Sequence, residues 1–143
     1  MPAKKFRLRI ITPALTKIDE DVERVIMRCT TGAMGILAGH ETRSAALIAG
    51  ILRILNNEVE RRIVVYGGLA MMENDVLTIL TNGTEWPEDI DLARAEAERE
   101  QAERRVLERE DDLELKHDQL LLRRALVRIE AGSRAFDSSK GEE

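Results

Sequence analysis

Few side chains in this sequence have the type and spacing of catalytic or metal-binding groups. The chain has one cysteine, Cys29, and two histidines, His40 and His117, which lie far apart in the sequence. No pair of them has the C-x-x-C or H-x-x-x-H spacing of a zinc site. Cys29 lies in an apolar, strand-like stretch, where a lone cysteine usually packs as a small buried side chain. The sequence therefore predicts neither a metal centre nor a cysteine nucleophile.

Phosphate transfer and acid–base catalysis also lack their usual signatures. The glycines within residues 32–35 do not belong to a G-x-x-x-x-G-K-[ST] phosphate loop. No serine stands in the G-x-S-x-G context of a nucleophile elbow. The paired carboxylates Asp111 and Asp112 lie in a charged, helix-forming region, where water solvates them. We therefore predict that the chain is not an enzyme by itself.

Basic side chains gather toward the end of a chain that is otherwise acidic. The formal net charge is −5, yet acidic residues thin out after Asp118. The cations of this region include Lys116, Arg123, Arg124, Arg128 and Arg134. A basic end on an acidic protein favours an acidic protein partner. The overall acidity argues against nucleic acid, because proteins that bind DNA or RNA normally carry a basic surplus.

The apolar stretches are too short for this chain to cross a membrane by itself. The longest, residues 45–52, falls well below the roughly 18–20 residues that a membrane-spanning helix needs. Arg7 and Arg9 interrupt the region in which a signal peptide would require an unbroken apolar core. The single cysteine fits a reducing compartment. We expect a soluble protein of the cytoplasm.

The first 87 residues have the pattern of a small all-β domain. Residues 6–10 alternate apolar and charged side chains, as a strand does when one of its faces meets a core. Further short strands are expected at 22–29, 50–55, 62–66, 69–72 and 76–80. The turn-forming pairs that separate these segments are Asn56-Asn57, Gly67-Gly68, Asn74-Asp75 and Asn82-Gly83. Many short strands at this spacing predict an antiparallel sandwich or barrel.

After Pro87 the composition changes to that of a helical domain. Residues 89–129 contain no glycine and no proline and are rich in Ala, Glu, Arg and Leu, which are strong helix formers. Asp89 is the expected N-cap of the first helix. The predicted domains are a β-sandwich at 1–87, two helices at 88–132 and a disordered tail at 133–143. The fold class is α+β with two domains, an N-terminal antiparallel β-sandwich followed by a C-terminal α-helical hairpin.

Apolar residues form narrow stripes on both predicted helices. The stripe on the first helix consists of Leu92, Ala95, Ala102 and Val106, and its alanines allow another helix to approach closely. The second helix has one stripe of Leu115, Leu122, Leu126 and Ile129. A second stripe, on nearly the opposite side, consists of Leu113, Leu120 and Val127. A helix that is apolar on two sides usually meets two different partners.

Two interpretations fit the joint between the helices. Asp111-Asp112 is the candidate turn, and it lacks the glycine or proline of a firm break. It is either an ordinary acidic turn of an antiparallel hairpin or a joint of marginal stability that straightens into one long helix. Straightened, about 40 residues at about 1.5 Å per residue would reach roughly 60 Å.

Several segments of the chain resemble the epsilon subunit of bacterial F-type ATP synthases. The most specific is residues 31–40, Thr-Gly-Ala-Met-Gly-Ile-Leu-Ala-Gly-His, which resembles the glycine-rich segment of that family ending in Gly-His. Residues 6–13 resemble its first strand, Gly67-Gly68 its paired glycines and residues 76–80 its V-T-I-L strand. Residues 90–95 open the first C-terminal helix as the family does. The resemblance covers nearly the whole chain.

The resemblance implies a non-catalytic rotor subunit. The β-sandwich would bind the gamma subunit and the ring of c subunits through Gly32, Ala33, Met34, Gly35 and His40. The family commonly has an acidic residue at the position of Ala33, on a loop facing the c ring, so no polar contact is expected there. The helices would fold against the sandwich or extend along gamma toward the alpha and beta subunits, and the extended form inhibits ATP hydrolysis in many bacteria. The protein would lie peripherally on the cytoplasmic face of the bacterial plasma membrane, as part of the proton-translocating complex.

The resemblance also implies a regulatory ATP site, although no cofactor is required. Residues 90–95 match the motif I/L-D-x-x-R-A through which some relatives bind ATP, and two further arginines lie four apart on the second helix. The implied site residues are Ile90, Asp91, Arg94, Ala95, Arg124 and Arg128. Guanidinium groups bind phosphate bidentately, and Asp91 would accept a hydrogen bond from the adenine amino group. Alternatively, Asp91 serves the helix dipole and Arg94 pairs with it.

Three hypotheses for the function follow. The first is a stalk subunit that couples rotation to proton-driven ATP synthesis and regulates ATP hydrolysis through its helices. The second is an ATP-binding sensor module, and the third is a structural adapter protein.

Overall fold

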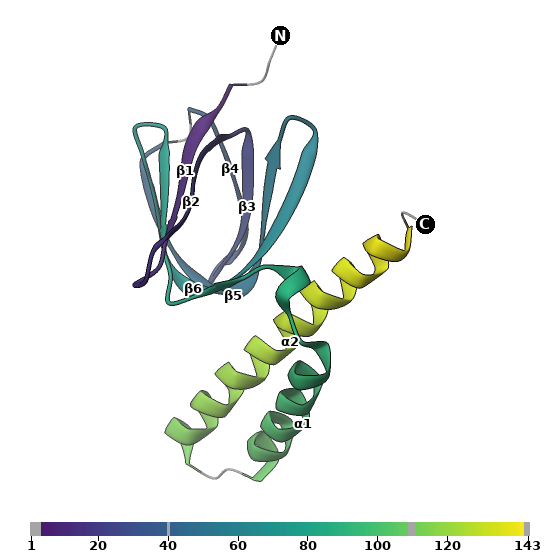
Figure 1. Cartoon of the computed structure of the whole chain (residues 1–143). Helices are drawn as coiled ribbons and strands as arrows, with labels where there is room; N and C mark the ends of the chain where they lie inside the picture. The colour runs from purple at the N-terminus through teal and green to yellow at the C-terminus, as the bar shows by residue number, and fades with distance from the viewer. Residues whose placement is uncertain (1–3, 40, 109–110, 142–143) are drawn as a thin grey trace. The chain divides into compact units, whose positions relative to one another are not determined.

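The computed structural model describes residues 4–39, 41–108 and 111–141 and divides into two compact units, Met1–Thr84 and Glu85–Glu143. The strands are β1 (Phe6–Ile11), β2 (Thr16–Val22), β3 (Arg24–Cys29), β4 (Gly32–Leu37), β5 (Arg43–Asn56), β6 (Val59–Glu73), β7 (Val76–Leu80) and β8 (Thr84–Glu85). They are followed by the 3₁₀ turn η1 (Pro87–Asp89) and the helices α1 (Leu92–Glu108) and α2 (Asp112–Gly141). The predicted order of a β-sandwich and a helical hairpin is confirmed (Figure 1).

The strands of the first unit form one sheet that folds onto itself as a sandwich. Their order is β2-β1-β7-β6-β5-β3-β4. All these neighbouring strands pair antiparallel except β1 and β7, which pair in parallel. The long strands β5 and β6 contribute to both layers, because β7 pairs with residues 69–73 of β6 while β3 pairs with β5. Strands β2 and β4 lie at the two edges of this order.

The alternation predicted for the first strand is present in β1. Phe6, Leu8 and Ile10 are at most 2% exposed, and Arg9 faces solvent. Burying such side chains contributes about 1.5–3 kcal/mol each. Cys29, at the end of β3, is also buried in this core. The first unit is therefore held together mainly by apolar side chains that project from alternate positions of the strands.

Gly67-Gly68 does not separate two strands, contrary to the prediction, and β6 runs through both glycines. Their φ angles are +85° and +131°, which side chains rarely adopt. A Cβ atom added to Gly68 would lie 1.9 Å from the carbonyl oxygen of Leu80 on β7. The two glycines therefore permit a close approach between neighbouring strands. Sequence alone cannot distinguish this use of paired glycines from a turn.

Two hairpin turns can be compared with the turn-forming pairs predicted from the sequence. Asn74 and Asp75 have φ angles of 51° and 58° between the paired residues Glu73 and Val76, as a two-residue turn requires. In the β5–β6 hairpin the positive φ angles belong to Asn57 and Glu58. The predicted Asn56-Asn57 turn is therefore displaced by one residue, because Asn56 pairs with Val59 in the ladder.

The second unit begins with a capped helix, but the cap is not the predicted one. Asp89 ends η1, and Ile90 after it is extended. Asp91 caps α1, because its Oδ1 accepts a hydrogen bond from the backbone N–H of Arg94 at 3.1 Å. Its carbonyl oxygen accepts another from the N–H of Ala95 at 3.0 Å. The prediction of Asp89 was wrong because the turn started by Pro87 places the helix start two residues later.

The hairpin bends between Glu108 and Asp112, and residues 109 and 110 lie outside the described part. Asp111 is the N-cap of α2, since its Oδ1 accepts a hydrogen bond from the N–H of Leu113 at 3.0 Å. The N–H of Leu115 donates to its carbonyl oxygen at 2.9 Å. In this structure the joint is therefore bent, and a capping carboxylate replaces the glycine or proline of a firmer turn.

Small side chains, more than leucines, form the packed faces of the two helices. Ala95 and Ala102 on α1 are buried, as is Ala125 on α2. A Cβ atom added to Gly132, one heptad after Ala125, would lie 2.8 Å from Cδ2 of Leu92. Leu126 is 47% exposed, so its predicted place in a packed stripe was wrong. A larger side chain at position 132 would therefore have to displace the side chain of Leu92.

Helix α2 continues to Gly141, although the sequence predicts a disordered tail from residue 133. No proline interrupts this stretch, and an existing helix adds residues more readily than a new one starts. Within the described residues, neither helix combines the length and the apolar character that crossing a membrane requires.

Candidate functional site

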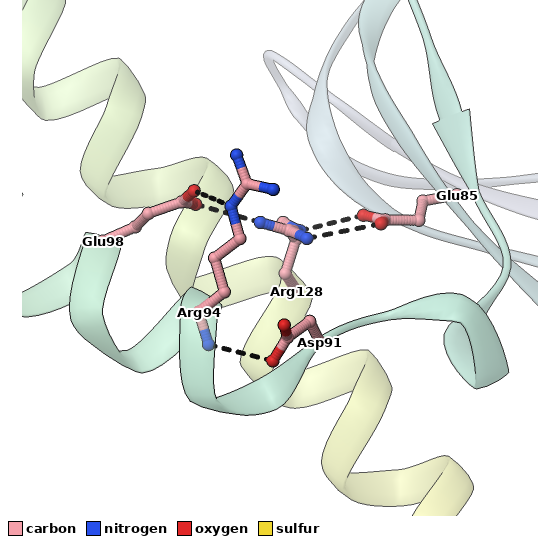
Figure 2. Close-up of polar contacts among 5 residues, drawn as sticks. All are labelled: Glu85, Asp91, Arg94, Glu98 and Arg128. Atoms are coloured by element: carbon pink, nitrogen blue, oxygen red, sulfur yellow. Dashed lines mark hydrogen bonds and ion pairs between the residues drawn. The ribbon is translucent and has the colours of Figure 1, made fainter.

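Arg128 on α2 is the centre of an ion-pair cluster in the second unit (Figure 2). Its Nε and Nη2 atoms donate to the two carboxylate oxygens of Glu85, at 2.8 and 3.3 Å. Its Nη1 atom donates to Oε2 of Glu98 on α1, at 2.9 Å. The Arg128 side chain is only 15% exposed. This single guanidinium therefore connects three segments of the unit, and the low exposure strengthens its charge-assisted hydrogen bonds.

Glu98 joins a second arginine to the cluster. Its Oε1 atom accepts a hydrogen bond from Nε of Arg94 at 3.2 Å, one turn earlier on α1. The Arg94 side chain is 73% exposed, so its remaining donors are accessible to solvent. One carboxylate thus lies between two guanidinium groups from different helices.

Every residue of the I-D-x-x-R-A motif has a structural contact of its own. The side chain of Asp91 caps α1 by accepting a hydrogen bond from the backbone N–H of Arg94. The guanidinium of Arg94 pairs with Glu98. The side chain of Ile90 lies against the position of Gly132, with Cγ2 at 3.3 Å from an added Cβ. Ala95 is fully buried. The motif therefore forms the start of the helical hairpin.

The structure brings part of the predicted ATP site together. Arg94 and Arg128 meet through Glu98, and Asp91 lies at the start of the same helix (Figure 2). Arg124 lies one turn before Arg128 on α2 and is half-buried. The sequence analysis missed Glu85 and Glu98. The spacing of four residues between Arg94 and Glu98 was a signal for the latter. Nothing in the sequence pointed from Arg128 to Glu85.

The charges of this cluster balance. Its two arginines, Arg94 and Arg128, pair with two carboxylates, Glu85 and Glu98. The donors suit a phosphate chemically, because guanidinium groups bind its oxygens in pairs. In this structure, however, the donors of Arg128 are directed at carboxylates. A phosphate would have to replace at least one of those carboxylates.

The predicted gamma and c-ring segment is an edge strand. Gly32, Ala33, Met34 and Gly35 belong to β4, which pairs with β3 on one side and ends the strand order. Gly32, Ala33 and Gly35 are exposed, and Met34 is half-buried. The loop expected at Ala33 is therefore a strand, because β3 supplies partners for its backbone groups. His40 lies outside the described residues.

The described cysteine and histidine, Cys29 and His117, show no sign of a second site. Burial raises the pKa of the Cys29 thiol, and the charge of Arg43 offsets this only in part. Cys29 is therefore a poor nucleophile. His117 is exposed on α2. Across residues 4–39, 41–108 and 111–141, no group of three or more His, Cys, Asp or Glu side chains is arranged to hold a metal ion.

Two family models match consecutive parts of the chain. Residues 5–87 match the beta-sandwich domain of the ATP synthase Delta/Epsilon chain. Residues 88–132 match the long alpha-helix domain of the same chain. Together the two matches include the edge strand β4 and all four residues of the ion-pair cluster, Glu85, Arg94, Glu98 and Arg128.

Whole-chain relatives and solved structures agree with these matches. The chain is 35% identical over 132 residues to the ATP synthase epsilon chain of Caldanaerobacter subterraneus subsp. tengcongensis, which covers 92% of this chain and 96% of the relative. It is 38% identical over 127 residues to the epsilon chain of Prochlorococcus marinus, with 87% and 96% covered. Its fold is similar to a chain of the Euglena gracilis mitochondrial ATP synthase, with a TM-score of 0.77 at 23% identity over 94% of this chain and 82% of that one. The chain belongs to the Delta/Epsilon chain family of ATP synthases.

Proposed function

We propose that this protein is a non-catalytic, epsilon-type subunit of the central stalk of an F-type ATP synthase. The observation that carries the proposal is the match of both family domains, over residues 5–87 and 88–132. The similarity to an epsilon chain over 92% of the sequence supports it. The protein turns with the rotor and so couples ion flow to ATP synthesis, and it is peripheral on the cytoplasmic face of the bacterial plasma membrane.

The β-unit binds the gamma subunit and the c-subunit ring in this proposal. Strand β4 supports it, because an edge strand has one side of its backbone without a neighbour in the strand order. Gly32, Ala33 and Gly35 are exposed and small, so a partner can approach this backbone closely. Co-purification with gamma tests this role and separates it from a free sensor or an unrelated adapter. Failure to bind gamma would contradict it.

The hairpin regulates ATP hydrolysis by folding or extending. Several leucines remain exposed while it is folded: Leu107 (86%), Leu113 (79%), Leu120 (46%) and Leu126 (47%). An extended arrangement along gamma, toward alpha and beta, would bury such side chains and offset the lost contacts between α1 and α2. Two packings of similar free energy are the requirement for a switch.

Removing the helices tests this regulation. The purified complex is assembled with the full chain or with a chain ending after Glu88, and its ATPase activity is measured. We expect higher activity without the helices, because the extended inhibitory form can no longer arise. Equal activity would count against autoinhibition, while co-purification with gamma in the same preparations shows whether the β-unit still assembles.

ATP is the second candidate, as a regulatory ligand of the hairpin. The meeting of Arg94 and Arg128 around one carboxylate favours it, because a phosphate could contact both helices at that point. A ligand that bridges α1 and α2 stabilises the folded form. Calorimetric titration with ATP compares the wild type with Asp91→Ala and Arg128→Ala. Weaker binding is expected in both variants, and unchanged affinity in both would remove this role.

A further inference from the structure

We propose that Glu98 occupies, from within the chain, the guanidinium donors that a phosphate ligand would use. In this role Glu98 keeps the hairpin closed without ligand and lowers the affinity of the same site for ATP. The inference rests on the ATP site proposed above and assigns to it a residue that the nucleotide motif does not contain.

The two carboxylates on Arg128 are not equivalent. Glu85 accepts from Nε and Nη2, so it engages one side of the guanidinium bidentately, and its side chain is 23% exposed. Glu98 accepts from Nη1 through one oxygen only, and its side chain is 43% exposed. A single, more hydrated hydrogen bond is easier to replace than a bidentate, less exposed pair. Glu98 is therefore the carboxylate that an incoming anion displaces.

The carboxylate of Glu98 also marks where an anion would lie. Its two oxygens accept from Arg128 at 2.9 Å and from Arg94 at 3.2 Å. Phosphate oxygens accept hydrogen bonds from guanidinium groups at similar distances. An anionic group at that point would contact α1 through Arg94 and α2 through Arg128, as Glu98 does now. In the absence of ligand, Glu98 acts as a substitute for that anion.

The ion pairs of Arg99 on α1 do not reach the second helix. Arg99 pairs with Glu96 at 3.0 Å and with Glu103 at 3.0 Å, all on α1. The bond from Glu98 to Arg128 crosses between the helices, so its loss weakens the closed hairpin directly. Substitution of Glu98 should therefore change two properties in opposite directions. The ligand-free hairpin becomes less closed, while ATP binds more tightly because its competitor is gone.

The variant Glu98→Gln removes the charge and keeps the size of the side chain. The matched control is Glu96→Gln, which removes one charge from the same helix and breaks only a pair within it. Spin labels at Ala93→Cys and Leu126→Cys, two exposed positions on α1 and α2, report closure of the full chain, with Cys29→Ala as the background. Distances are measured by pulsed electron paramagnetic resonance without nucleotide and with saturating Mg-ATP, and ATP affinity by calorimetry.

We expect Glu98→Gln to increase the open fraction about threefold without nucleotide, and Mg-ATP to restore the closed distance. The dissociation constant for ATP should fall about three- to tenfold, as expected for a part-exposed ionic competitor. Glu96→Gln should change neither measurement.

Three results would overturn the inference. The first is unchanged closure in Glu98→Gln, and the second is binding of ATP to neither protein. The third is a hairpin that opens while ATP affinity falls, which is the behaviour of a purely structural ion pair. These measurements use the isolated chain, so they stand apart from the ATPase test of the proposed function. If deletion of the helices left the ATPase activity of the complex unchanged, that result would contradict regulation of hydrolysis. It would not bear on the competition between Glu98 and phosphate at Arg128.

Discussion

Arg128 on α2 and Glu98 on α1, which are 30 positions apart in the sequence, form a hydrogen-bonded ion pair of 2.9 Å between Nη1 and Oε2. The pair connects the two helices at the level where Arg94 and Glu85 also join the cluster. The same guanidinium is therefore both a structural link of the folded hairpin and the donor that a phosphate would require. Four measurements test the contacts on which the two units depend.

Arg128→Ala should destabilise the helical unit by about 1–3 kcal/mol, because it removes a 15% exposed guanidinium that donates charge-assisted hydrogen bonds to both Glu85 and Glu98. Arg94→Ala is the matched control, since its side chain is 73% exposed and its ion pair contributes less than about 1 kcal/mol. Urea unfolding followed by helical circular dichroism measures the difference. Equal effects of the two substitutions would contradict the central place of Arg128.

Gly68→Ala should destabilise the β-unit by about 3 kcal/mol or more, through both backbone strain and overlap. The residue has a φ of +131°, and the new Cβ would lie 1.9 Å from the backbone oxygen of Leu80. Gly83→Ala is the control, because its nearest heavy atom is Cδ2 of Tyr66 at 3.5 Å. Thermal unfolding of both variants measures the effect. A stable Gly68→Ala protein would show that β6 and β7 are not so close.

Asp91→Ala should reduce the stability of the helical unit by about 0.5–2 kcal/mol, because the N–H of Arg94 loses its capping carboxylate. Asp89→Ala is a control in the same short segment, and it should have little effect because Asp89 is exposed and ends η1 before the helix begins. Helical circular dichroism during denaturation separates the two. If Asp89→Ala proved the more damaging substitution, α1 would have to begin earlier.

Stability of the β-unit should depend on Asp19 in acid. The hydrogen bond from Arg7, at 2.7 Å, lowers the pKa of Asp19 below its ordinary value of 3.8. A depressed pKa in the folded state stabilises the protein above the unfolded pKa, and this contribution is lost as the pH falls through the folded pKa. As the pH falls below about 5, the Asp19→Asn protein should therefore lose less stability than the wild type. Denaturation at a series of pH values measures this difference. Parallel pH profiles would contradict the pairing.

Local patterns were sufficient to predict the classes of structure. The alternation of Phe6, Leu8 and Ile10 predicted a half-buried strand, and the stretch after Pro87 without glycine or proline predicted helices. Predictions failed where one local pattern fits two structures. Paired glycines fit either a turn or a close contact between strands, and Asp89 and Asp91 both fit an N-cap. Neighbouring contacts decided between them.

The candidate site was predicted only in part. The motif at residues 90–95 and the arginines at 124 and 128 were implied by the resemblance to the family. Glu85 and Glu98 were missed, because a carboxylate gains its role only from the guanidinium that lies beside it. Glu85 lies 43 positions before Arg128, and no periodicity relates them.

By itself, the sequence determined the two-part organisation and the kinds of elements, because these depend on composition and on repeats of two or about 3.6 residues. The resemblance to a family came from specific motifs, such as residues 31–40 and 90–95. Tertiary structure alone decided that Gly68 meets Leu80, that Gly132 meets Leu92 and that Arg128 is shared by Glu85 and Glu98. Those relationships depend on the register in which distant segments pack, and register is a property of the folded chain that no short stretch of sequence contains.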